Sequence, residues 1–300
     1  MANPTSLVAV GCASFPNPQN ACAKMKSRTE IELFHKKIFD FYYLNRRQFP
    51  WRETTDRYAV MISEIMLQQT QTERVIPKFE AWLHQFPDIP HLTAAPLRDV
   101  LAFWSGLGYN SRAVRLHQCA ALINERYGGV VPSQPQLLKQ LPGIGEYTSR
   151  SIPIFADNGD FAAVDTNIRR IFIHEFALPE TISAAKLQEF ADAALPCGQS
   201  RAWHNALMDY GALHLTSKKS GIAPLTRQSK FAGSKRWYRG RLIKELVRSE
   251  ALSLREIEER YGDCPWNLND IIGDLVSEGL VERYENAATG ALTTLKIKGS

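Results

Sequence analysis

The chain has 300 residues, of which 44% are hydrophobic and 22% charged, and its formal net charge at pH 7 is +5. This composition excludes an intrinsically disordered chain and a small disulfide-stapled scaffold, and the length allows two domains. No apolar run in the sequence approaches the length of a membrane-spanning helix. Five scattered cysteines without a CxxC pair indicate neither a disulfide framework nor a zinc site, so we expect a globular protein of a reducing, intracellular compartment such as a bacterial cytoplasm.

Helical periodicity dominates the chain up to residue 280. Residues 1–27 lack this periodicity and are expected to form a disordered extension. From residue 28 to residue 214, apolar residues recur at helical spacing, and glycine or proline marks most of the expected helix ends. This pattern predicts a mainly α body. The expected helices cover residues 30–43, 59–72, 77–86, 97–104, 112–127, 146–156, 166–176, 184–194 and 201–214, with a short helix from Pro132 before residue 141.

A basic linker, residues 215–236, is expected to follow this body. A segment whose charges are all positive can bind a polyphosphate such as DNA, although the same composition is equally typical of a solvated linker. Between residues 215 and 240 the sequence has no acid and seven cations, namely Lys218, Lys219, Arg227, Lys230, Lys235, Arg236 and Arg239.

Residues 237–300 combine helical and strand patterns, which predict a winged-helix-like α+β domain. Helices are expected at 239–248, from a Ser253–Glu256 capping box onward, and at 268–278, and strands at 281–284 and 292–297 around a turn at 289–290. The third helix is expected to expose an acidic face, which would be repelled by a phosphate-lined groove. We therefore expect this domain to bind a protein partner, or DNA through its wing and basic first helix. The exposed face is expected to contain Asn269, Asp270, Asp274 and Glu278.

A glycine hairpin lies between two predicted helices in the body. Gly143 and Gly145 occur in LPGIG at residues 141–145, directly before the helix that starts at Glu146. Glycines let a backbone approach a ligand closely, and the free amides and dipole of a helix N-terminus favour an anion such as a DNA phosphate. A plain helix–helix turn would have the same residues.

Glu64 is the first candidate for acid chemistry. It is surrounded by apolar residues and forms a polar stripe with Gln68 and Gln71, at i, i+4 and i+7 of the expected helix. A solvated helix face is the ordinary explanation of such a stripe, but this stripe carries amides and only one charge. A carboxyl group in an apolar setting has a raised pKa and can hold a proton for a leaving group.

Asp165 is the second candidate. It follows an apolar run and precedes a helix, so its simplest role is an N-cap. The same position keeps a carboxylate ionised, because a helix N-terminus favours negative charge. Two carboxyl groups held in opposite protonation states form the acid and cation-stabiliser pair of glycoside hydrolysis.

Several motifs occur together, and with them the chain resembles the helix-hairpin-helix (HhH-GPD) DNA glycosylases, most of all the adenine DNA glycosylase branch. The resemblance covers residues 30–214 and implies two helical lobes with DNA bound across the cleft between them. The motifs are PWR at 50–52, SEIMLQQTQ at 63–71, GLGY at 106–109, LPGIG at 141–145, VDTN at 164–167 and ALMDYGA at 206–212.

The resemblance also implies roles for single residues. Glu64 matches the acid that protonates the base, and Asp165 matches the carboxylate that stabilises the oxocarbenium ion. Tyr147 occupies the place where lyase relatives have a Schiff-base lysine, so a lyase activity is expected to be weak or absent. The resemblance places further residues at the DNA or base, namely Arg52, Gln68, Gln69, Tyr109, Asn110, Gly143, Gly145, Asn167 and Asn205.

Three departures from this branch stand out. First, its four-cysteine iron–sulfur loop would align with Leu215, Ile222, Leu225 and Phe231, which cannot ligate iron, so we expect no cluster, no other cofactor and no metal. Instead, these side chains are expected to pack as a small apolar plug. Second, the tail is too short for the branch's domain that inspects oxidised guanine. Third, Asn110 replaces a second tyrosine. In addition, Asn205 stands where the family often has Glu or Gln.

Together these features predict a monofunctional DNA glycosylase of base excision repair. Its partner is expected to be double-stranded DNA with a mispaired or modified base, without a membrane, in a bacterial nucleoid or elsewhere inside a cell. Adenine is favoured as the excised base because of the LQQTQ segment at residues 67–71. A thymine, uracil or modified-base glycosylase of the same fold is the first alternative. A non-catalytic DNA-structure-binding protein is the alternative from another class.

Overall fold

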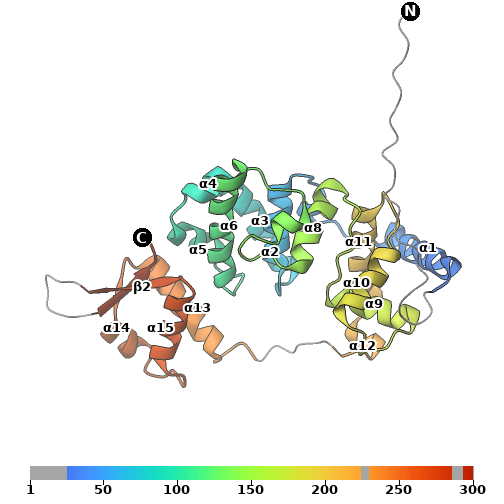
Figure 1. Cartoon of the computed structure of the whole chain (residues 1–300). Helices are drawn as coiled ribbons and strands as arrows, with labels where there is room; N and C mark the ends of the chain where they lie inside the picture. Colours follow the sequence, from blue (N-terminus) through green and yellow to red (C-terminus); the bar gives the residue numbers. More distant parts are fainter. Residues whose placement is uncertain (1–25, 224–229, 286–292, 300) are drawn as a thin grey trace, which may run out of the picture.

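The computed structural model describes residues 26–223, 230–285 and 293–299 of the chain, which form two helical lobes and a C-terminal domain (Figure 1). The extension expected at residues 1–27 lies almost entirely outside the described residues. Ser27, its last residue, is the N-cap of the first helix, where it forms a capping box with Glu30. None of the helices that the structure describes is both long and apolar enough to cross a membrane.

The middle lobe contains the helix that was expected around Glu64. Its core is apolar, with the rings of Trp82 and Trp104 fully buried and 5.7 Å apart. Helices α2 and α8 pack against each other, as do α4 and α6. The elements are η1 (Pro50–Arg52), α2 (Arg57–Leu67), α3 (Thr72–Gln85), α4 (Ile89–Ala94), α5 (Leu97–Trp104), α6 (Ser111–Tyr127), α7 (Pro135–Leu138) and α8 (Glu146–Asp157).

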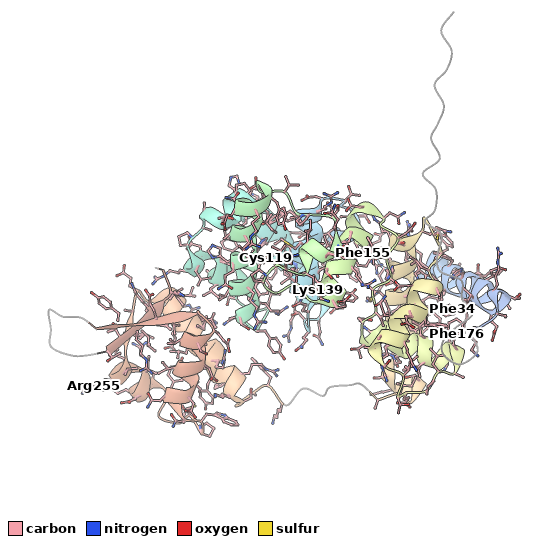
Figure 2. The ribbon with its side chains drawn as sticks, viewed as in Figure 1. Phe34, Cys119, Lys139, Phe155, Phe176 and Arg255 are labelled. Atoms are coloured by element: carbon pink, nitrogen blue, oxygen red, sulfur yellow. The ribbon has the colours of Figure 1, made fainter. Side chains whose placement is uncertain are left out.

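The second lobe combines segments that precede and follow the middle lobe in the sequence. Its first helix, which precedes the middle lobe, packs with helices that follow residue 165. Aromatic rings fill its core, and those of Phe34 and Phe176 lie 4.8 Å apart in an edge-on contact (Figure 2). The middle lobe is thus inserted between the two halves of this one. The elements are α1 (Arg28–Asn45), α9 (Thr166–Phe176), α10 (Ala184–Ala193), α11 (Ser200–Asp209), a π-helical turn η2 (Tyr210–His214) and α12 (Ser217–Ser220).

Helix α2 ends at Leu67, five residues before the expected end. The guanidinium of Arg112, buried on α6, donates from Nη1 to the carbonyl oxygens of Ile65 (2.8 Å) and Met66 (3.0 Å). These carbonyls would otherwise lack partners at a helix C-terminus, so Arg112 caps α2. The expected stripe of Glu64, Gln68 and Gln71 is therefore wrong, since only its first residue lies on the helix.

The C-terminal domain has the winged-helix-like arrangement that the sequence predicts, and the mainly α fold class is confirmed. Its three strands form an antiparallel sheet in the order β1-β3-β2, with Val281 opposite Ile297 and Leu252 opposite Leu295. The turn expected at 289–290 lies outside the described residues. The elements are α13 (Lys235–Arg248), β1 (Leu252–Ser253), α14 (Leu254–Arg260), α15 (Leu268–Ser277), β2 (Val281–Glu285) and β3 (Thr293–Ile297).

The acidic face expected on the third helix, α15, is only partly exposed to solvent. Asn269 and Asp270 are exposed as expected. Asp274, however, pairs with Lys235 at 2.8 Å, and Glu278 pairs with Arg239 at 2.6 Å. Both side chains stay partly exposed, at 44% and 32%, so the expected face is present, but cations of α13 neutralise its two carboxylates.

The C-terminal domain packs on the middle lobe through α13 and α5. Tyr238, Leu242 and Leu246 of α13 belong to the same apolar cluster as Leu101 and Trp104 of α5. Arg98 on α5 also donates to the carbonyl of Glu250, at 3.1 Å. The domain is therefore held against the middle lobe, on the side away from the second lobe (Figure 1).

Candidate active site

A cavity of about 450 Å³ is lined by residues of both lobes, with Phe155 of α8 at the junction (Figure 2). This volume suits a small ligand such as a nucleobase. The cavity brings together residues that are far apart in sequence. Of the predicted site residues, it gathers Arg52, Glu64, Gln68, Gln69, Tyr147, Asp165, Asn167 and Asn205, and it does not gather Tyr109, Asn110, Gly143 or Gly145.

Glu64 reaches the cavity from α2, whose other faces are buried in the core. Burial raises the pKa of Glu64 to about 7, and the negative charge of Asp165 contributes in the same direction. A hydrogen bond with Ser151 of α8 opposes this rise. A carboxyl group with this pKa holds a proton on a large fraction of molecules at neutral pH, as a general acid must.

Asp165 is the N-cap of α9, in the other lobe. Its Oδ1 accepts from the Ile168 amide at 2.7 Å, and its Oδ2 accepts from Asn167 Nδ2 at 3.0 Å. Burial raises the pKa of Asp165, whereas these two donors and the charge of Arg170 act to lower it. The cap expected from sequence is present, but burial outweighs its effect on the pKa. Asp165 nevertheless has dedicated donors for its anion.

Tyr147, in the first turns of α8, lies near both carboxyl groups. Burial, with the charges of Glu64 and Asp165, raises the pKa of its phenol well above the ordinary value. The phenol is therefore neutral, and it can donate or accept a hydrogen bond without adding charge. No lysine occurs among the described residues that line this cavity.

Gln68 and Gln69 form the turn that follows α2. Gln68 Nε2 donates to Thr148 Oγ1 at 3.3 Å. Gln69 is exposed and has a left-handed backbone (φ 56°), which is uncommon for a residue other than glycine. Arg112 supports this turn because its Nη2 donates to Thr70 Oγ1 at 3.0 Å. The structure thus presents Gln69 at the rim of the cavity.

Arg52 lines the cavity, but its guanidinium is already engaged. Its Nη1 donates to Asp209 Oδ2 at 2.8 Å and its Nη2 donates to Asp209 Oδ1 at 2.9 Å. Arg47 also donates to the same carboxylate, which is fully buried. This bidentate pair fixes the guanidinium at the wall of the cavity.

The glycine hairpin lies outside the cavity, between α7 and α8. Gly143 has φ 81°, and a Cβ there would approach Arg115 Cβ to 3.1 Å, so both conformation and packing favour glycine. Gly145 is the N-cap of α8 and has open space around the position of a Cβ. Their expected contact with a DNA phosphate stays a prediction.

Tyr109 and Asn110 line a second cavity, beside the C-terminal domain. Tyr109 has φ 49°, and its hydroxyl accepts a hydrogen bond from Arg236 of α13. This position follows from domain packing, which no local sequence pattern encodes.

Sequence reasoning missed Arg201, which lines the cavity, and two residues that interact with the carboxyl groups, Ser151 and Arg170. Ser151 bonds to Glu64 and lies four residues after Tyr147, so helical spacing could have indicated it. Arg170 approaches Asp165 and donates to Asn167 Oδ1 at 2.9 Å. Arg201 lines the cavity, and its Nε is buried without a hydrogen-bond partner among the described residues. No sequence signal pointed to Arg201.

The loop after η2 does not fit an iron–sulfur cluster. Leu215 and Ile222 are buried aliphatic residues, and Leu225 lies outside the described residues. Phe231 is 53% exposed and does not pack as part of the expected apolar plug, because it lies against the guanidinium of Arg236, 5.3 Å away. Within the described ranges, no group of three or more His, Cys, Asp or Glu side chains could hold a metal ion.

Comparison with known proteins identifies the family. A family model described as HhH-GPD superfamily base excision DNA repair protein matches residues 62–197. The chain is 32% identical over 269 residues to the adenine DNA glycosylase of Mycolicibacterium smegmatis, which covers 82% of this chain and 92% of that relative.

Two solved structures are similar in fold. The structure of a thermostable thymine-DNA glycosylase matches with a TM-score of 0.60 and 27% identity, covering 64% of this chain and 90% of that one. A non-covalent endonuclease III–DNA complex matches with a TM-score of 0.58 and 17% identity, over 67% and 91% of the two chains. The chain therefore belongs to the HhH-GPD superfamily of base excision DNA repair proteins, is related to adenine DNA glycosylases, and is a DNA glycosylase.

Proposed function

We propose that this glycosylase binds duplex DNA, flips one mispaired or modified base into the cavity between its lobes, and hydrolyses the N-glycosidic bond, with adenine favoured as the base. The observation that carries this proposal is the meeting of Glu64 and Asp165 in one cavity with unlike hydrogen-bond partners. Extrusion of a base costs a few kcal/mol and costs least at a mispair.

Glu64 supplies the proton. Its pKa of about 7 lets it donate to a ring nitrogen of the base, so that the base leaves with the electron pair of the C1′–N bond. The protonated form is present below this pKa and is lost as the pH rises through it. Base release that depends on this proton therefore decreases above about pH 7.

Asp165 supports the cation that remains on the sugar. Its carboxylate receives two hydrogen bonds that stabilise the anion, so it offers a fixed negative charge to the oxocarbenium ion. Water then adds to C1′ and gives its proton to the ionised Glu64, which restores the starting protonation state. Both the bond broken and the bond formed are accounted for without any other group.

Hydrolysis is favoured over a lyase reaction. A lyase needs an amine that attacks C1′, and Tyr147 together with the other described residues of the cavity wall offers no lysine for this step. We therefore expect an abasic product with an intact strand, or with only slow cleavage.

The choice of adenine is supported by relatives named adenine DNA glycosylase, one of them 32% identical over 82% of this chain. A thymine, uracil or modified-base substrate is the second candidate, supported by the thymine-DNA glycosylase that shares this fold at 27% identity.

A non-catalytic DNA-structure-binding protein is the weaker alternative, because binding alone does not require two half-buried carboxyl groups with raised pKa values in one cavity. A protein partner for the C-terminal domain also stays a proposal, supported by the exposed Asn269 and Asp270 on α15. Because its proposed substrate is chromosomal DNA, we propose that the protein works inside the cell, at the nucleoid if the cell is bacterial.

The test is a panel of duplexes, each with one defined mispair or modified base and an end label. After single-turnover incubation with excess enzyme, hot alkali converts abasic sites into strand breaks. We expect breaks in one or a few duplexes, with a mispaired adenine among them, and few breaks when the alkali step is omitted.

The matched control uses the same chemical change at two glutamates. Glu64→Gln should abolish release, whereas Glu80→Gln, at an exposed position on α3, should not change it. Tight binding without release from any duplex would favour the DNA-structure-binding protein. Breaks of equal yield without alkali would show a lyase.

A further inference from the structure

A second cavity, of about 790 Å³, lies between the middle lobe and the C-terminal domain. One wall is the 105–110 segment after α5, and the other is α13. Gln69 lines this cavity as well as the candidate catalytic one, so the two cavities adjoin at that residue. We call this second cavity the α13 groove.

The α13 groove has an uneven charge. The described residues that line it include no carboxylate and five cations, namely Arg74, Arg236, Arg241, Lys244 and Arg248. Arg74, Lys244 and Arg248 are exposed and form no ion pair with any residue that the structure describes. A concave surface with charge of one sign concentrates a ligand of the opposite sign.

On the opposite side of α13 the cations are paired with carboxylates, so the excess of positive charge is confined to the groove side. There, Lys235 and Arg239 are paired with Asp274 and Glu278 of α15, at distances of 2.6 to 3.3 Å. The helix thus neutralises its cations where it meets its own domain. Lys244 and Arg248, one turn apart on the groove side, are left to face solvent.

Aromatic rings hold two of the groove's guanidinium groups in place. The Arg236 guanidinium lies 5.0 Å from the ring of Tyr109 and 5.3 Å from that of Phe231. The Arg241 guanidinium lies 4.7 Å from the ring of Trp237. Arg236 also donates to the Tyr109 hydroxyl, so its guanidinium is fixed at the wall of the groove. The planar fork of a guanidinium matches phosphate oxygens.

We infer that the α13 groove binds the phosphodiester backbone of the same duplex whose base enters the catalytic cavity. This inference rests on the proposed function, because it takes DNA as the substrate. A duplex held at Gln69 continues away from the catalytic cavity, and the groove starts at the same residue. The C-terminal domain then acts as a second hold on DNA through the cationic side of α13 and not through α15.

Another possible occupant is an acidic protein segment. DNA is favoured because the groove adjoins the candidate catalytic cavity at Gln69 and because its cations come from both the middle lobe (Arg74) and the C-terminal domain (Lys244 and Arg248). A site for a separate protein would not need a cation from the catalytic lobe. The test below distinguishes the two occupants.

The experiment compares two double variants of the full chain, each with two fewer positive charges on the same domain. Lys244→Gln with Arg248→Gln changes the groove. Arg255→Gln with Arg260→Gln changes α14, where Arg255 lies on the side of the domain away from the lobes (Figure 2). Affinity for a duplex with the preferred mispair is measured by fluorescence anisotropy from 50 to 200 mM salt, in the Glu64→Gln background, which prevents base release.

The groove variant should bind DNA about tenfold more weakly at 150 mM salt, and the slope of log affinity against log salt should fall by about 1 to 2, since each lost phosphate contact removes about 0.9 from it. The α14 variant should match the parent, and both variants should melt at the parent's temperature. With Glu64 restored, the α14 variant should release the base as the parent does.

Equal affinity and equal slope for the two variants would overturn the inference and would favour an acidic protein as the occupant. The result is independent of the proposed reaction. If the wild-type chain binds DNA through the groove but releases no base from any duplex, the proposed function fails and this inference stands.

Discussion

The two cavities of this protein differ in almost every physical respect, although they meet at Gln69. The candidate catalytic cavity contains two half-buried carboxyl groups whose pKa values are raised. The α13 groove contains five cations, three of them exposed. Desolvation raises the pKa of an acid and so suits it to proton transfer. Solvent-exposed cations attract phosphate without any change of pKa. In this comparison, the groups proposed to set the rate and those proposed to set DNA affinity lie on separate surfaces, so substitutions are expected to change each quantity alone.

The largest expected effect is on rate. Glu64→Gln removes the proton donor with little change in shape, so single-turnover base release should fall by about 10²–10⁴-fold. DNA affinity should stay within about threefold, because this carboxyl group is not a phosphate contact. Rapid-quench kinetics and anisotropy measure the two quantities. A loss of affinity as large as the loss of rate would break the separation between the cavities.

Asp165→Asn should reduce release by about 10²–10³-fold, because the oxocarbenium ion loses its negative partner. The free energy of unfolding should hardly change, since asparagine caps a helix N-terminus about as well as aspartate.

Asp165→Ala is the companion variant. It loses the cap as well, so it should be destabilised by about 1 kcal/mol in urea unfolding. If the asparagine variant is as unstable as the alanine variant, the cap depends on the negative charge and a neutral side-chain oxygen does not replace it.

Arg112→Met should destabilise segments that line both cavities. This buried guanidinium caps α2 and bonds to the carbonyls of Leu107 and Gly108, so its loss leaves several buried oxygens without donors. We expect the free energy of unfolding to fall by about 3 kcal/mol. Arg126→Met, at an exposed position on the same helix, should change it by less than about 0.5 kcal/mol. Urea denaturation followed by fluorescence measures both.

The smallest expected effect concerns pH. In the wild type, log rate should decrease above about pH 7 with a slope near −1, because Glu64 loses its proton there. Ser151 acts to lower the pKa of Glu64, so Ser151→Ala should move this limb to higher pH. The affinity of the groove for DNA should not follow this limb. If the decrease in rate moves to lower pH in Ser151→Ala, the serine raises the pKa of Glu64 instead of lowering it.

Much of the fold was predictable because its signals are local. The helix expected at 97–104 coincides with α5, and the capping box at Ser253 opens α14. The meeting of Glu64 and Asp165 was expected, although only from the combination of several motifs. Periodicity alone would have assigned both residues to ordinary structural roles.

The features that sequence reasoning missed depend on contacts between distant residues. The end of α2 is set by Arg112, which lies 45 residues after Leu67 in the sequence. The pairing of Asp274 and Glu278 depends on where α13 begins and how it crosses α15. The position of Tyr109 depends on a domain that starts more than 100 residues later. No window of neighbouring residues contains this information.

The insertion of the middle lobe between α1 and α9 has a consequence for selectivity. Glu64 belongs to the inserted lobe, and Asp165 begins a helix of the other lobe. The distance between the two acids therefore depends on the angle between the lobes. A duplex that is too stiff to bend would bind with Glu64 and Asp165 misaligned on its nucleotide. Two duplexes that bind equally well can then differ in the rate of base release, and the property of DNA that sets this difference is its bendability.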